Sequence, residues 1–265
     1  MAPKIIVDGQ NEAVVAHRRA VASSVIAAFG CSLPDLRLLV FLSDSDVAIL
    51  GFDPPANRGL HFPVNETTMM GSLPENLYEL LVGADVAHGH ADYKGVFEFD
   101  CAIYLHRSAC EDDVGLTMTL AHELQHFVQF GCQPKLWKLH AVVMSLDRTL
   151  EAAGFRWEHI PAEREARIIG KRIAIQLCGK QRTRDYIEKM ERLKITPGDA
   201  ADWKFIQTID VDEQFDLSRD MSAFFQLIVP YRLELESNLR GSTDLEFADV
   251  DLPEAFRDAP EPAVV

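Results

Sequence analysis

Hydrophobic residues recur at helical spacing near the N-terminus and again through the second half of the chain. Residues 11–29 carry most of their large apolar side chains on one helical face, interrupted by Arg18, and Gly30 follows as a stop signal. Apolar residues also recur at helical spacing in later segments that begin at a capping residue or proline or end at a glycine. These segments predict further helices over residues 75–83, 113–130, 134–153, 161–179, 183–194 and 218–240, the last with a break at Pro230. The pattern therefore predicts a helical second half.

Short runs of apolar, β-branched and aromatic residues predict a few strands in the first half. Residues 36–42 (LRLLVFL) form an apolar run typical of a buried strand, and residues 95–106 contain one or two more. Residues 43–75 have Gly, Pro, Asn and Ser at short intervals, which favours loops around one brief strand at 47–52. We therefore expect an α+β fold: a small N-terminal mixed sheet with flanking helices, then a mainly helical half.

The last 25 residues differ from the rest in composition. Residues 241–265 hold seven acids, one Arg and three prolines, which is typical of a partly ordered acidic tail. This segment supplies −6 of the net charge of −15. No firm boundary is visible elsewhere, so we expect a single domain over residues 1–240.

Charge and cysteine usage narrow the expected partners and compartment. The chain has 41 acidic against 26 basic residues, and this excess would repel a phosphate backbone or an anionic lipid surface. The five cysteines are widely spaced without a CxxC pair, no secretory signal is visible, and no stretch approaches the roughly 18 apolar residues of a membrane span. These features predict a cytoplasmic protein that binds neither nucleic acid nor membrane.

One motif within the predicted helix 113–130 carries a specific chemistry. In the segment TLAHELQHFVQ, His122 and His126 are four residues apart, so their imidazoles lie on one face and can point at one ion. Glu123 lies about 100° round the helix and can reach a water molecule at that ion. Two nitrogen donors and an adjacent carboxylate are what metal-assisted hydrolysis requires.

The His-Glu-x-x-His motif of residues 122–126 resembles that of the zincin metallopeptidases. The resemblance implies a zincin-like fold, one Zn²⁺ per chain bound by His122 and His126, Glu123 as general base, and a peptide or protein substrate. In zincins, the strand before this helix often presents an open edge to extended substrate. Cys101–His106 occupies the corresponding place, and a plain core strand is the alternative interpretation.

A catalytic zinc site of this kind needs a third protein ligand. Glu163, with Ala166 three residues later, resembles the Glu-x-x-Ala-Asp pattern of glutamate-type zincins, and the small Ala166 would let its helix approach the motif helix closely. This chain has Arg167 where that pattern has Asp, which removes the usual partner of a ligand histidine. An acid in the first turn of a helix also has a purely structural explanation in the helix dipole.

Two other residues are alternative third ligands. Glu165 belongs to the same predicted helix as Glu163. Cys132 falls at the third ligand position of the metzincin pattern HExxHxxGxxH, although Gln129 stands where that pattern requires Gly. Elsewhere, His88 and His90 beside Asp92 could hold a second metal, or form an ordinary solvated turn.

The sequence thus predicts a zinc-dependent hydrolase, with a metallopeptidase as the leading hypothesis. The alternative is a zinc-stabilised binding or regulatory protein that retains the motif without cleaving, which the unusual Arg167 would suit. A non-peptidase zinc hydrolase acting on a small amide is a third hypothesis. The basic run at 164–184 is interpreted as a solvated helical face rather than a docking patch.

Overall fold

The computed structural model describes residues 2–43, 58–63, 99–132, 150, 154–156, 160–193 and 197–228. Several expected features lie outside them: the strand at 47–52, the helix at 75–83, His88 with His90 and Asp92, nearly all of the helix at 134–153, and the acidic tail at 241–265.

Two compact units are distinguished along the chain. The first comprises Met1–Val128 and Ala166–Val211, and the second comprises Gln129–Glu165 and Asp212–Val265. Two of the three boundaries fall inside helices, α5 (Asp113–Cys132) and α8 (Pro161–Cys178), and the third falls between Val211 and Asp212, outside any helix.

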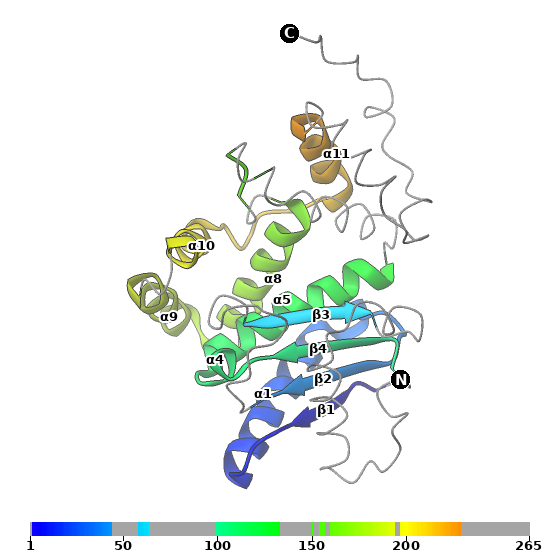
Figure 1. Cartoon of the computed structure of the whole chain (residues 1–265), viewed down its shortest axis with the longest axis vertical. Helices are drawn as coiled ribbons and strands as arrows, with labels where there is room; N and C mark the ends of the chain where they lie inside the picture. Colours follow the sequence, from blue (N-terminus) through cyan, green and yellow to red (C-terminus); the bar gives the residue numbers. More distant parts are fainter. Residues whose placement is uncertain are drawn as a thin grey trace. The chain divides into compact units, whose positions relative to one another are not determined.

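The first unit is built on a four-stranded mixed sheet in the order β1-β2-β4-β3 (Figure 1). Strands β1 (Lys4–Val7), β2 (Leu38–Leu42) and β4 (Cys101–Leu105) are parallel, whereas β3 (Gly59–Pro63) is antiparallel to β4. The small mixed sheet and the many helices confirm the expected α+β class.

The two central strands form the core of the sheet. All five residues of β2 and all five of β4 are buried. Side chains alternate between the two faces of a strand, so continuous burial means that both faces are covered. The rings of Phe41 and Tyr104 stack across the pair with centroids 5.8 Å apart. The apolar run at 36–42 is therefore a buried strand, as predicted.

Of the two interpretations left open for Cys101–His106, the structure supports the plain core strand. Cys101–Leu105 pairs with β2 on one side and β3 on the other, so it is a core strand rather than an open edge. The outermost strand on that side, among the described residues, is β3, within a stretch expected to be a loop. Its five residues include a terminal Gly and Pro and have no clear alternation, so only pairing with β4 identifies them as a strand.

Helix α1 (Glu12–Phe29) follows β1 and confirms the predicted helix at 11–29. The Asn11 side chain caps it by accepting hydrogen bonds from the backbone of Ala13 and Val14, and Gly30, at φ 55°, ends it. His17 of α1 contacts Asp113 in the first turn of α5, with His17 Nε2 2.7 Å from a carboxylate oxygen. In Figure 1 both helices lie behind the sheet.

Helix α5 begins and ends close to its predicted bounds. It is preceded by a short, unpredicted helix, α4 (Arg107–Cys110), and by Asp112, whose carboxylate accepts a hydrogen bond from the Val114 backbone at 2.8 Å. This confirms Asp112 as the cap. Gly131 does not end the helix, which continues to Cys132, because a Gly with helical φ interrupts no hydrogen bonds.

Three further helices contribute to the first unit. Helix α8 confirms the predicted helix at 161–179 and ends at Gly179, at φ 89°. Helix α9 (Lys180–Leu193) begins three residues earlier than predicted, and α10 (Pro197–Thr208) was not predicted. Tyr186 and Trp203 join α9 to α10 edge to face, with ring centroids 5.8 Å apart.

The second unit contains the last residues of α5 and the first residues of α8, together with α11 (Leu217–Ile228). Phe155 and Phe224 pack edge to face with centroids 5.9 Å apart, and Arg164 donates to both oxygens of Glu213 at 2.9 Å. Helix α11 confirms the first part of the helix expected at 218–240, whereas Pro230 lies outside the described residues.

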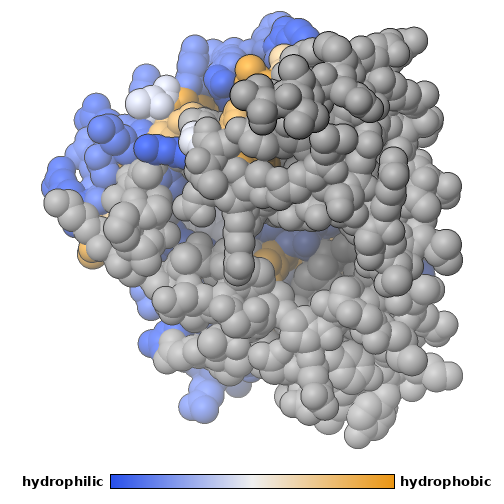
Figure 2. Space-filling model, turned by 45° about the horizontal axis from the view of Figure 1, so that its top comes forward, coloured by the Kyte–Doolittle hydropathy of each residue, from blue (hydrophilic) through white to orange (hydrophobic). Residues whose placement is uncertain are grey.

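The visible described surface is mainly hydrophilic on the face drawn in Figure 2, with hydrophobic side chains in small areas. Among the described residues, the exposed large hydrophobic side chains are Val14, Leu177, Leu193 and Leu227. The same part of the chain contains no helix that is both long and apolar enough to cross a membrane.

Candidate metal centre

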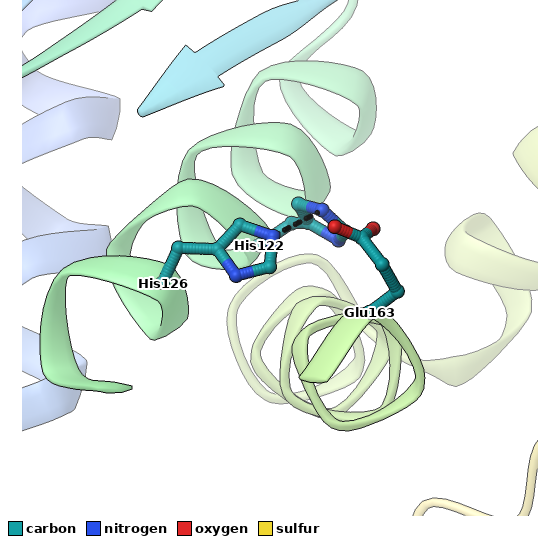
Figure 3. A group of neighbouring side chains, drawn as sticks. All are labelled: His122, His126 and Glu163. Atoms are coloured by element: carbon teal, nitrogen blue, oxygen red, sulfur yellow. Dashed lines mark hydrogen bonds between the residues drawn. The ribbon is translucent and has the colours of Figure 1, made fainter. Parts of the chain in front are cut away.

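His122 and His126 project from one face of α5, as their spacing predicts. Their Nε2 atoms are 3.1 Å apart, and the ring centroids are 4.7 Å apart with the planes nearly perpendicular at 87° (Figure 3). Two nitrogens each about 2.05 Å from one tetrahedral ion would lie about 3.3 Å apart. The separation in this structure therefore suits two ligands of a single ion.

Glu163 completes the group from the first turn of α8. Its side chain points toward the two imidazoles (Figure 3), and the three residues each offer a ligand atom within 4.8 Å of the others. Glu163 is only 5% exposed, although carboxylates are seldom buried without a partner. Two imidazole nitrogens and a carboxylate oxygen form a donor set suited to Zn²⁺, so the residues present fit the ion that the motif implies.

Small residues on α8 allow a close approach to α5. A Cβ atom at Gly170 would lie only 2.8 Å from the carbonyl oxygen of Met118, one turn before His122. Ala166 and Ala162, four and eight residues before Gly170, are buried. At the other end, Gln129 donates a hydrogen bond to the Ala162 carbonyl at 3.1 Å. As α5 advances from Met118 to Gln129, its contacts on α8 run backwards from Gly170 to Ala162, as in an antiparallel pair.

Glu123 lies beside the group and under the edge strand. It is 6% exposed, and a Cβ atom at Gly59 of β3 would lie 2.8 Å from its Oε1 atom. The same added atom would be 2.9 Å from Thr119 on α5. Glycine at position 59 therefore lets the backbone of β3 approach the Glu123 carboxylate more closely than any other residue would.

His61, also on β3, lies close to α5. Its ring packs edge to face against Phe127, with centroids 6.3 Å apart. Burial, together with the nearby charge of His126, lowers the pKa of His61 from 6.5 to about 3. At neutral pH His61 is therefore uncharged and adds no positive charge beside the histidines.

The structure separates Glu163 from the two alternative ligands. Glu165 lies two residues further along the same helix, about 200° round its axis, and accepts a hydrogen bond from Gln129 at 2.6 Å. Cys132 is exposed in the last turn of α5. Neither belongs to the metal-binding group found among the described residues, which brings together His122, His126 and Glu163.

Arg167 has a structural explanation. Its guanidinium donates to the Asp202 carboxylate of α10 at 2.7 Å, and its side chain is 10% exposed. Arg164 pairs with Glu213, and Lys171 donates to three backbone carbonyls at the end of α10 and beyond it, those of Ile206, Gln207 and Ile209. These basic side chains of α8 are thus used in intramolecular contacts rather than forming the wholly solvated face that was expected.

Sequence reasoning missed two residues next to the group. Gly59 stood in an expected loop, and no local signal marked it. Gln129 did carry a signal, because it lies three residues after His126 and seven after His122, on the same face of the helix. In the sequence-based prediction it enters only as a departure from the metzincin pattern.

Comparison with known proteins found no match among family models, curated proteins or solved structures. Function is therefore inferred from the side chains of α5, α8 and β3.

Proposed function

We propose that this chain is a zinc-dependent hydrolase of the glutamate-type zincin class, acting on peptide bonds. The observation that carries the proposal is the convergence of His122, His126 and Glu163 from two helices, with Glu123 buried beside them. The 37-residue separation of Glu163 from His126 makes this convergence a property of the fold and not of one helix.

Each residue has a role that follows from its chemistry. His122 and His126 supply neutral nitrogen donors, and Glu163 supplies a negative charge that compensates a divalent cation. Bound zinc would polarise the substrate carbonyl and lower the pKa of a water molecule to about 7. Glu123, next to the ligands, would act as the general base, holding the proton of the attacking water and delivering it to the leaving amine.

The edge strand supports a peptide as the substrate. Among the described residues, β3 pairs on one side only, with β4, and a strand with an open edge can pair with an extended peptide through backbone hydrogen bonds. Gly59 is the point where β3 meets Glu123. A peptide lying along β3 would therefore pass close to the general base.

The test combines metal content with cleavage of a broad peptide library. We expect about one zinc per chain in the wild type, in Cys132→Ser and in Glu123→Gln, and loss of zinc in Glu163→Ala. Hydrolysis should fall by about 10²- to 10⁴-fold in Glu123→Gln, the usual contribution of a general base. Glu111→Gln, which changes an exposed acid outside the group, is the matched control and should cleave as the wild type does.

Two results would contradict the proposal. If the wild-type protein binds no zinc after reconstitution, the proposed metal centre is wrong. If zinc-loaded Glu123→Gln cleaves as fast as the wild type, the proposed role of Glu123 as general base is wrong.

A further inference from the structure

Gln129 is a buried polar residue at the end of the motif face of α5. Its side chain is 3% exposed, although glutamine is usually found at the surface. On a helix, residues 122, 126 and 129 follow one another along one face, so Gln129 continues the row begun by the two histidines.

The amide of Gln129 makes two hydrogen bonds with the first turn of α8. Nε2 donates to the carbonyl oxygen of Ala162 at 3.1 Å and to the carboxylate of Glu165 at 2.6 Å. A primary amide nitrogen has two N–H donors, so both are used. The bond to the charged acceptor is the shorter one, as expected for a charge-assisted hydrogen bond.

These two contacts flank the proposed metal ligand. Ala162 immediately precedes Glu163 and Glu165 follows two residues later, so the backbone that carries Glu163 is held from both sides within one helical turn. The carboxylate of Glu165 is at the same time engaged by Gln129, which leaves Glu163 as the carboxylate of this turn that joins the histidines.

Charged side chains at position 129 would not do this. A carboxylate would face both the Glu165 carboxylate and the Ala162 carbonyl without a proton to donate. A Lys or Arg would place a positive charge near the proposed cation site. A neutral amide can donate twice without either penalty.

We propose that Gln129 is a positioning residue of the metal centre, which sets the first turn of α8 so that Glu163, and not Glu165, is the third ligand. This inference rests on the proposed function. It goes beyond the motif, because no property of the HExxH pattern requires glutamine at this place.

The test is a titration of the metal-free full-length protein with Co²⁺, followed by its visible absorption spectrum, with Zn²⁺ competition. Gln129→Met keeps length and helix propensity but removes both donors. We expect it to weaken Co²⁺ binding by about 10- to 100-fold, the usual effect of losing a residue that orients a ligand, and to change the visible bands. Gln125→Met, one turn earlier on the same helix and also buried, is the control and should leave affinity and spectrum unchanged.

A second variant separates positioning from general stability. Gln129→Glu alone should weaken binding at least as much as Gln129→Met, because two carboxylates then face each other. Adding Glu165→Gln restores one donor–acceptor pair with the roles exchanged, and should recover part of the lost Co²⁺ affinity.

The outcomes are distinct. Gln129→Met with wild-type Co²⁺ affinity and spectrum would overturn the positioning role, even if its metal-free form melts at a lower temperature. Wild-type protein that binds neither Co²⁺ nor Zn²⁺ would overturn the proposed function, and the positioning role with it. Binding that is lost in Glu163→Ala but normal in Gln129→Met would leave the proposed function standing and overturn only this inference.

Discussion

The charged side chains at positions 163, 165 and 167 of α8 have three different partners. Glu163 joins the histidines, Glu165 binds Gln129, and Arg167 binds Asp202. Residues two apart on a helix point about 200° apart, so successive members of this series face different neighbours. The Arg at position 167 is explained by its contact with α10, and this removes one of the two arguments for a non-cleaving protein. The other argument, the absence of a recognisable specificity motif, is unaffected.

A second charged pair, Arg37–Asp100, joins the residues that come just before two core strands, β2 and β4. Arg37 donates to Asp100 from its backbone nitrogen at 2.8 Å, from Nε at 3.2 Å and from Nη2 at 3.0 Å. The Arg37 side chain thereby holds the pKa of Asp100 below its ordinary value of 3.8, against the smaller effect of burial. The contacts link the segments that lead into β2 and β4.

We predict that Asp100→Asn lowers the free energy of unfolding at pH 7 by about 0.2–1 kcal/mol, a modest loss because the pair is over a third exposed. Because the folded state has the lower pKa, the stabilisation is complete above the ordinary pKa of 3.8 and is lost as pH falls through the folded value. Urea unfolding of both proteins at pH 7 and pH 3 would measure this. The difference between them should shrink at pH 3, and a difference independent of pH would contradict the electrostatic explanation.

At the scale of elements, the crossing of α5 and α8 is set by small residues. Helix propensity alone predicts that replacing a helical Gly with Ala stabilises a protein by up to about 1 kcal/mol. At Gly170 this gain is opposed by the Met118 carbonyl, a backbone atom that cannot move aside without moving α5. Overpacking of this kind costs about 1–3 kcal/mol, so steric cost should exceed propensity.

We therefore predict that Gly170→Ala is destabilising by up to about 2 kcal/mol, and that it also weakens Zn²⁺ binding because α8 carries Glu163. Chemical denaturation and a metal titration would measure the two effects. The matched control is Gly131→Ala, an exposed helical glycine at the end of α5, which should be neutral or stabilising. Equal stabilisation by both substitutions would show that the approach at Gly170 is not tight.

At the scale of the whole molecule, metal binding and folding should be linked. The proposed ligands come from residues 122, 126 and 163, and an unfolded chain rarely holds such a set together. We predict that Zn²⁺ at 100 times its dissociation constant raises the free energy of unfolding by about 2.7 kcal/mol, and that a chelator reverses the change. Thermal melts with and without added Zn²⁺ would measure it.

Glu163→Ala is the control for this linkage and should show little or no stabilisation by Zn²⁺. An equal rise in melting temperature in the wild type and the variant would place the metal elsewhere.

The single-domain expectation for residues 1–240 remains a prediction at this scale, as do the cytoplasmic location and the peptide substrate.

Much of the fold was predictable where local signals were strong. The helices at 11–29, 113–130 and 161–179 have hydrophobic periodicity together with Asn11, Asp112 or Pro161 at their starts, and each formed within two residues of its expected bounds. The elements that were missed are β1, β3, α4 and α10, which are short or flanked by turn residues. Short elements are stabilised by their neighbours more than by their own propensity.

The sequence by itself determined the pair of imidazoles and the adjacent carboxylate, because helical periodicity places residues 122 and 126 on one face whatever surrounds the helix. It also indicated Glu163, but left Glu165 and Cys132 open. Only the tertiary structure brings Glu163, and neither alternative, into one group with the histidines, because this depends on how α8 meets α5 at Gly170 and Gln129. It also decided that β3, and not β4, is the strand above Glu123, because strand order arises from pairing between distant segments, which no local pattern encodes.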